Sequence, residues 1–89
     1  MRGKFIVLEG IDGAGTTTQA FLLNEFLKNN QIPTHLTREP TNSIIGGVIR
    51  SILKGEWKPT PRILPLLFAA DRVYHTEREI KPLLEKGIN

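Results

Sequence analysis

The chain has no cysteine, and this absence excludes disulfides and thiolate metal sites. It also lacks long apolar runs. No apolar stretch follows the N-terminus as in a secretory signal, and no window approaches the roughly 20 apolar residues of a membrane-spanning helix. The lack of cysteine is in keeping with a reducing compartment. We therefore expect a cytoplasmic protein with no membrane partner.

Acidic side chains are fewer than basic ones, 9 against 12, so the formal net charge is +3. A basic balance favours anionic partners, although scattered, solvated lysines explain most of these charges more simply. Aromatic residues are also scarce, and they do not alternate with the dispersed lysines and arginines. A small nucleic-acid-binding protein is therefore the weakest functional class, and we expect no nucleic-acid partner.

The length of 89 residues allows one small domain with a modest core. Hydrophobic content of 39% and charged content of 24% are ordinary for a globular chain, which argues against disorder.

The stretch that organises the chain is KFIVLEGIDGAGTTTQ, residues 4–19. Its apolar run predicts a strand over about Lys4–Glu9 that is buried on both faces. A glycine-rich turn and the start of a helical pattern follow at once, with Gly10, Gly13, Gly15, Thr16, Thr17 and Thr18. A strand, a glycine-rich turn and a helix start, in this order, are the parts of a phosphate cradle.

Against the P-loop pattern G-x-x-x-x-G-K-[ST], Gly10, Gly15 and Thr17 match, but Thr16 stands in place of the lysine. The backbone N–H groups from Gly13 to Thr17 can surround a phosphate, and the Thr17 hydroxyl is at the position that reaches Mg²⁺. Thr16 can donate a hydrogen bond but brings no charge to the phosphates. The alternative is a βα turn that binds nothing; the order of the elements favours phosphate.

Further patterns predict one more strand and several helices. We expect the strand over residues 34–37 and then a turn-rich loop at 37–43. The expected helices cover 16–29, 44–53 with a Ser43 cap and a stop at Gly55, and 77–86 with Pro82 near its start and Gly87 at its end. A further helix is expected where Leu66, Leu67, Ala70, Val73 and Tyr74 share a face, with Pro65 in the first turn. Alternating strands and helices predict an α/β fold with a parallel sheet. Two strands are too few to bury both faces of the first strand, so the chain reads as the front portion of a larger domain.

Three motifs in this order and at these separations, LEGIDGAGTTTQ, TREP at 37–40 and LLFAADR at 66–72, resemble the N-terminal part of the thymidylate kinase family. The resemblance covers essentially all 89 residues. It implies a P-loop nucleoside monophosphate kinase that uses Mg²⁺ and transfers the γ-phosphate of ATP to dTMP, giving dTDP. It also implies the three-layer parallel sheet of P-loop NTPases. Residues 1–89 would be the N-terminal part of that domain, with two strands and three to four helices but without the lid and the C-terminal strands.

By this resemblance, Asp12 would bind the deoxyribose of dTMP, Arg38 its phosphate and Arg72 a thymine carbonyl, while Phe68 would stack on the thymine ring. Arg38 and Thr16 are the catalytic candidates. Thr17 would face the Mg²⁺. The residues that would hold ATP are Gly10, Ile11, Asp12, Gly13, Ala14, Gly15, Thr16, Thr17 and Thr18.

Each of these roles has a physical reason and an alternative. Phe68 and Arg72 are four residues apart, so on a helix they share a face. Alternatively, Phe68 is core and Arg72 pairs with Asp71 or a surface acid. Arg38 falls at the carboxyl end of the second expected strand, where its planar fork suits a phosphate, or it is a surface arginine. Asp71 and His75 have the same spacing, and we expect a solvated helix contact there.

Two departures from the family bear on turnover. Thr16 replaces the lysine, and the lid that supplies a catalytic arginine when position 13 is not arginine is absent. We therefore expect that the chain alone is not an autonomous kinase but a fragment, a split subunit or a truncated product. The expected partners are dTMP and ATP, with a homodimer or a complementing C-terminal chain as further possibilities. The alternative function is a non-catalytic nucleotide-binding module.

Overall fold

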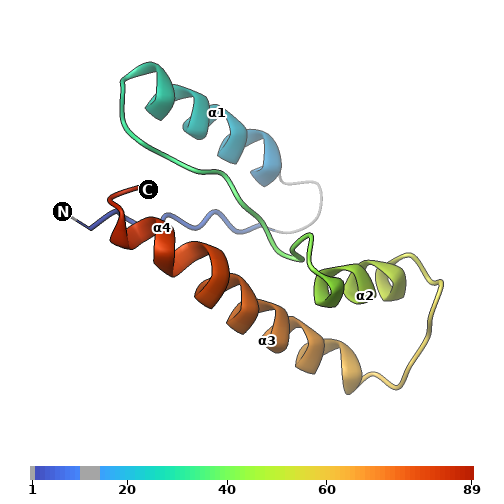
Figure 1. Ribbon diagram of the computed structural model, residues 1–89. Helices are drawn as coiled ribbons and strands as arrows, with labels where there is room; N and C mark the ends of the chain where they lie inside the picture. Colours follow the sequence, from blue (N-terminus) through green and yellow to red (C-terminus); the bar gives the residue numbers. More distant parts are fainter. Residues whose placement is uncertain (1, 11–14) are drawn as a thin grey trace. The chain divides into compact units, whose positions relative to one another are not determined.

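The structure is a computed structural model that describes residues 2–10 and 15–89. The chain divides into two compact units, one made of residues 1–36 and 80–89, the other of residues 37–79. Figure 1 labels the helices of both.

The first unit contains helix α1 (Thr16–Asn29), at the bounds that the sequence predicted. Gly15 precedes it in the left-handed conformation, with φ of 78°. At the other end, the Asn30 side-chain amide donates to the carbonyl of Phe26 at 2.7 Å, which satisfies an orphan carbonyl of the last turn. The helix is therefore specified by its own residues and its two ends.

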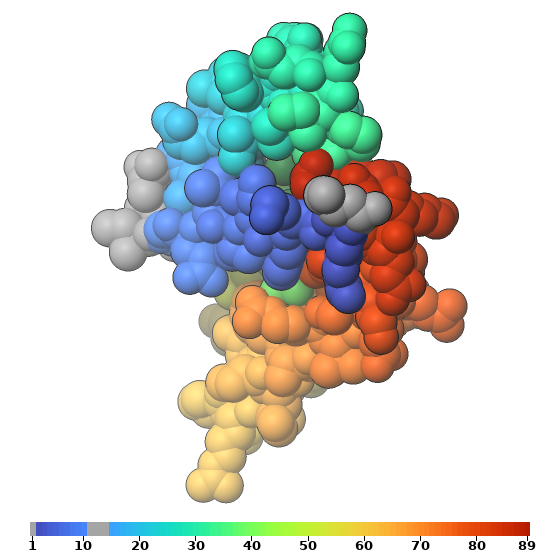
Figure 2. Space-filling model, turned by 90° about the vertical axis from the view of Figure 1, so that its left-hand side faces the viewer, coloured from blue at the N-terminus to red at the C-terminus, as the bar shows by residue number. Residues whose placement is uncertain are grey.

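The predicted strand at residues 4–9 is absent, since residues 2–10 contain no strand. The expectation that it is buried on both faces is also wrong, because Phe5 is 56% and Leu8 44% exposed. Figure 2 shows this segment (blue) at the surface. The described backbone bonds of the segment lie at its start, where Gly3 donates to the Leu84 carbonyl and Lys4 to the Asn89 side chain, both at 2.8 Å. Without a ladder along its length, an apolar run does not become a strand.

The second predicted strand, residues 34–37, is likewise not a strand. Its backbone does meet the last residue: Asn89 donates to the Pro33 carbonyl at 3.0 Å, and His35 donates to the Asn89 carbonyl at 2.8 Å. These two bonds flank Thr34 in the manner of a parallel ladder. One residue in ladder register is too little to form a strand, and this is the physical reason that the two-strand prediction fails in the structure.

The first unit also holds helix α4 (Lys81–Glu85), with Pro82 in its first turn. Gly87 ends the turn that follows with φ of 80°, as predicted. The predicted single helix over 77–86 is wrong in its start, because the π-helix η1 (Thr76–Ile80) precedes α4. Pro82 has no N–H for the carbonyl four residues earlier, and a widened turn before it accommodates this loss.

The second unit contains α2 (Ile44–Leu53) and α3 (Ile63–His75), which pack against each other. Ser43 caps α2 as predicted, since its side chain accepts from the Gly46 N–H at 3.2 Å. Ile49 of α2 is fully buried, whereas many other large apolar side chains of the described residues are exposed. The core is therefore small.

Gly46 sits in the middle of α2 for a steric reason. A Cβ at this position would lie 1.9 Å from the carbonyl oxygen of Thr41. The helix and the preceding loop thus approach so closely that only glycine fits.

Within the described residues, 2–10 and 15–89, the helices are too short or too polar for any of them to cross a membrane.

Candidate functional site

The loop that joins residue 37 to α2 is held to α3 by a buried carboxylate. Asp71 is fully buried, and its two oxygens accept from the Thr41 N–H at 2.8 Å and the Thr41 hydroxyl at 2.7 Å. The Ser43 hydroxyl donates to the same carboxylate at 3.2 Å. Burial raises the pKa of Asp71, but the hydrogen bonds from Thr41 and Ser43 and the charge of His75 outweigh it, so the pKa lies below its usual value.

A second carboxylate, Glu39, joins two side chains of the same helix. Its Oε1 accepts from the Nε and Nη2 of Arg72 at 3.1 and 2.9 Å, and its Oε2 lies 2.9 Å from the Nδ1 of His75. Partial burial raises the pKa of Glu39, but the bonds with His75 and Arg72 and the charges of both outweigh it, so the pKa is lowered. Glu39 is therefore held as a carboxylate between a cation and an imidazole.

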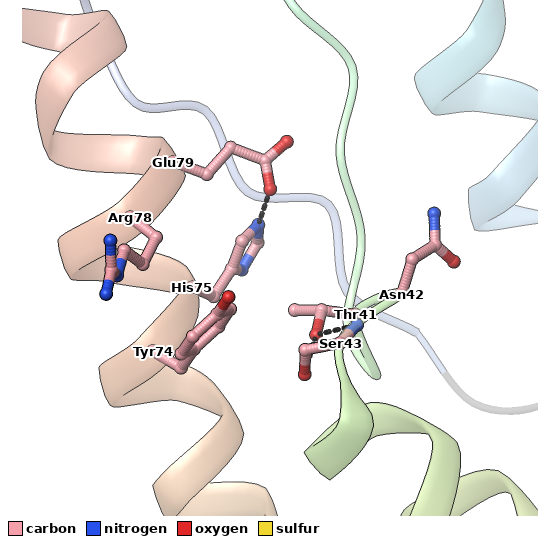
Figure 3. A pocket seen from close by; sticks show the side chains of 7 residues that line it. All are labelled: Thr41, Asn42, Ser43, Tyr74, His75, Arg78 and Glu79. Carbon is pink, nitrogen blue, oxygen red and sulfur yellow. Dashed lines mark hydrogen bonds and ion pairs between the residues drawn. The ribbon is translucent and has the colours of Figure 1, made fainter.

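His75 is the centre of this arrangement. It is 3% exposed, and its Nε2 hydrogen-bonds with the Thr37 hydroxyl at 2.7 Å and lies 3.4 Å from Glu79. Figure 3 shows the side chains of His75 and Glu79 turned toward each other. The expected solvated contact between Asp71 and His75 is therefore wrong, because both side chains are buried. Asp71 bonds to Thr41, and His75 bonds to Thr37.

Helix α2 holds the same loop from its own side. The Arg50 guanidinium donates to the carbonyls of Pro40 and Thr41. Arg50 and the close approach at Gly46 tie the loop to α2, while Asp71, Glu39 and His75 tie it to α3. Residues 37–43, which we call the clasped loop, are thus fixed by two helices of the same unit.

A small cavity of about 260 Å³ lies beside the clasped loop (Figure 3). Its lining includes the Tyr74 ring, over which the Arg78 guanidinium lies 5.9 Å from the ring centroid. The other lining residues are Thr41, Asn42, Ser43, His75, Arg78 and Glu79. The volume is below that of most small-molecule pockets, and none of the residues predicted to bind nucleotide lines it.

The structure places all three described dTMP-binding candidates in the second unit. Arg38 is exposed and lies in the clasped loop; Phe68 is half-buried and Arg72 exposed, one turn apart on α3. The sequence offered Asp71 or a surface acid as an alternative partner of Arg72. In the structure Arg72 forms an ion pair with Glu39 of the clasped loop. Glu39 binds Arg72 and is the next residue after Arg38 in the sequence, and Phe68 has no described hydrogen bond or ion pair in this arrangement.

Sequence reasoning missed Glu39, Asp71 and His75. The signal was present as spacing: Asp71, Arg72 and His75 fall within little more than one turn of a helix, while the loop TREPTNS offers carboxylate and hydroxyl groups. Polar groups of this kind on a helix and in a loop are typical of side-chain networks.

The structure describes only some of the residues predicted to hold ATP. Ile11, Asp12, Gly13 and Ala14 lie outside the described residues. Gly10 is exposed, Gly15 has its left-handed φ, and Thr16, Thr17 and Thr18 form the first turn of α1, which contains no acidic residue. A left-handed glycine leading into a helix N-terminus with hydroxyls and no carboxylate fits a phosphate group. In the part of the chain that is described, no group of three or more His, Asp or Glu residues is arranged to hold a metal ion.

Comparison with known proteins gives a consistent result. The family model "Thymidylate kinase" matches residues 8–89. The chain is 48% identical to the "Probable thymidylate kinase" of Pyrococcus horikoshii over 98% of the chain and 45% of that protein. It is 42% identical to the "Thymidylate kinase" of Carboxydothermus hydrogenoformans over 99% of the chain and 44% of that protein. The chain therefore spans just under half the length of these curated relatives.

Proposed function

The chain belongs to the thymidylate kinase family, and we propose on this basis that it supplies the nucleotide-binding front portion of a kinase that transfers the γ-phosphoryl group of ATP to dTMP. Membership implies the P-loop NTPase fold. The proposed reaction gives dTDP and depends on Mg²⁺. The observation that supports the proposal within this chain is the clasped loop, because it carries Arg38 and its Glu39 binds Arg72 of α3.

We assign dTMP to the second unit. Arg38 has an exposed guanidinium whose planar fork suits the 5′-phosphate. Arg72, with a side chain 71% exposed, is held by Glu39 through its Nε and Nη2 and is the proposed donor to a base carbonyl. Phe68, one turn earlier on α3, has a ring for stacking. Asp12, for the deoxyribose, remains a prediction.

We assign the phosphates of ATP to the turn before α1, where ATP would supply the phosphoryl group and Mg²⁺ would neutralise its developing charge. Gly10 and Gly15 allow the backbone to approach a phosphate closely, and the N–H groups of the first turn of α1 face it. The Thr17 hydroxyl is the proposed metal-side ligand, and Thr16 donates a neutral hydrogen bond where the P-loop pattern has a cation.

A second candidate function, a nucleotide-binding module without catalysis, is favoured by one observation. Thr16 brings no charge to the transferring phosphoryl group, and stabilisation of that charge is the main part of phosphoryl-transfer catalysis. We therefore propose binding rather than turnover as the activity of the 89-residue chain by itself. A homodimer or a complementing chain remains a prediction.

The proposal is tested by titrating the purified chain with dTMP, Mg-ATP and single-stranded DNA. We expect saturable dTMP binding that weakens about tenfold in Arg72→Ala, since a hydrogen bond to a charged group is worth about 1.5–3 kcal/mol. The matched control is Arg62→Ala, because Arg62 is an exposed arginine just before α3. ATP binding without a dTMP response would favour the module, and DNA binding with steep salt dependence would contradict both.

A further inference from the structure

His75 is a buried imidazole that uses both of its nitrogens on the clasped loop. Nδ1 lies 2.9 Å from the Glu39 carboxylate, and Nε2 lies 2.7 Å from the Thr37 hydroxyl. These two partners are the immediate neighbours of Arg38 in the sequence. A single side chain of α3 therefore holds the chain on both sides of Arg38.

The burial pattern of the loop agrees with this arrangement. Thr37 and Glu39 are half-buried and Arg38 between them is exposed. The side chains of Thr37 and Glu39 both bond to His75 of α3, and the side chain between them is the exposed one. The exposure of Arg38 agrees with the two bonds that hold its neighbours to His75.

Glu39 extends the same arrangement to the second arginine. Its other oxygen accepts both the Nε and the Nη2 of Arg72, and its side chain is only 17% exposed. We propose that His75 and Glu39 form a positioning pair that sets Arg38 and Arg72 for one nucleoside monophosphate, so that recognition of the phosphate depends on this pair. The proposal rests on the assignment of dTMP to the second unit.

The negative charge of Glu39 allows a positioning role to be distinguished from a purely electrostatic effect on dTMP binding. A carboxylate next to an arginine that binds a phosphate weakens anion binding through simple electrostatics. Removing that charge should therefore strengthen dTMP binding if Glu39 has no positioning role. If Glu39 positions the arginines, its removal should weaken dTMP binding. The two readings differ in the direction of the effect.

The pair can be removed without releasing the loop from the helices. Thr41 and Ser43 remain bonded to Asp71, and Arg50 remains bonded to the Pro40 and Thr41 carbonyls. The titratable and charged groups that face His75 are Glu39 and Glu79, with Asp71 one turn earlier on α3. Loss of the imidazole therefore changes the placement of residues 37–39 more than the attachment of the whole loop.

The experiment compares the affinities of the full chain for dTMP and for thymidine, which lacks the phosphate. The dissociation constant of thymidine divided by that of dTMP reports the contribution of the phosphate to binding. In His75→Phe, which keeps a ring but no nitrogen, and in Glu39→Gln, which removes the charge, we expect this ratio to fall about tenfold. A variant that merely loosens the fold weakens both ligands alike and leaves the ratio unchanged.

The control is Glu77→Gln, since Glu77 is an exposed carboxylate outside the clasped loop. A second readout needs no ligand: the Nε–H resonance of Arg72, identified by its loss in Arg72→Ala, should lose its protection from exchange in His75→Phe.

The outcomes separate the two proposals. If the unsubstituted chain binds no dTMP, the proposed function fails and the positioning pair fails with it. If it binds dTMP and the ratio is unchanged in both variants, or rises in Glu39→Gln, only the positioning pair is overturned. If His75→Phe loses the helical circular dichroism of the chain, Glu39→Gln alone decides.

Discussion

Each of the two units has an extended segment beside helices, and the two segments are held in different ways. Residues 5–8 are apolar and exposed, and the hydrogen bonds described for this segment lie just before them, at Gly3 and Lys4. The clasped loop is polar and carries bonds from Asp71, His75 and Arg50. An apolar extended segment needs a sheet around it, whereas a polar loop can be fixed by side chains of helices in its own unit. The region proposed for dTMP is therefore the one that is fixed by contacts within its own unit.

Removal of Asp71 should have the largest effect on the clasped loop. In Asp71→Ala, the Thr41 N–H and the Thr41 and Ser43 hydroxyls lose their buried acceptor, which should cost the second unit about 3 kcal/mol. The measurement is urea unfolding, together with hydrogen exchange of the Thr41 amide. Asp71→Asn keeps one acceptor oxygen and should recover part of the loss, and Glu77→Ala is the exposed control. A loss below about 0.5 kcal/mol would show that the loop does not depend on the carboxylate.

A smaller effect is expected from a pair of glycine substitutions in α2. A Cβ at Gly46 would lie 1.9 Å from the Thr41 carbonyl oxygen, so Gly46→Ala forces the loop from the helix and should destabilise by about 1–3 kcal/mol. At Gly47 the nearest atom would be the Arg50 guanidinium at 3.8 Å, so Gly47→Ala should stabilise the helix by up to about 1 kcal/mol. Unfolding midpoints of the two variants should therefore move in opposite directions. A stabilising Gly46→Ala would contradict the close approach.

The stability of the second unit should depend on pH, with a smaller effect than that of the substitutions above. The pKa values of Glu39 and Asp71 are both lowered in the folded chain. Their stabilisation is thus fully present above the pKa values of the unfolded chain, and it is lost as pH falls through the lower, folded values. We expect the second unit to lose stability below about pH 4, as measured by hydrogen exchange of the Thr41 amide against that of α1. A Thr41 amide equally protected at pH 7 and pH 3 would overturn this expectation.

Much of the helical structure could be predicted because it depends on residues near in sequence. The bounds of α1 follow from Gly15, a periodic apolar face and Asn30, and the start of α2 follows from the Ser43 cap. The strands could not be predicted in the same way. The Thr34 segment meets Asn89, a partner 55 residues away, so its state depends on a ladder rather than on its own β-branched residues.

The residues of the candidate site also differ in whether they depend on local or on long-range features of the sequence. Arg38, Arg72 and Phe68 could be named from the sequence because motif and helical spacing are local features, and their roles stay predictions. The carboxylate and imidazole that hold Arg72 and Thr37 were missed, because Glu39 and His75 are 36 residues apart and their pairing exists only once the loop has met α3. A helix with Asp71 and His75 one turn apart reads as solvated unless its partner is known, and polar burial of this kind is set by tertiary contacts.

The smallest effect is expected in the exposed segment of residues 4–9. Val7 is 55% exposed, so Val7→Thr, which keeps the branched shape and adds a hydroxyl, should change the free energy of unfolding by less than about 0.5 kcal/mol. Ile49→Thr is the matched change at a fully buried position and should cost several times more, because it buries a hydroxyl and leaves a cavity. Both are measured by urea unfolding of the same 89-residue chain. If Val7→Thr costs as much as Ile49→Thr, the segment is packed in solution, and the contrast between an open apolar segment and a clasped polar loop disappears.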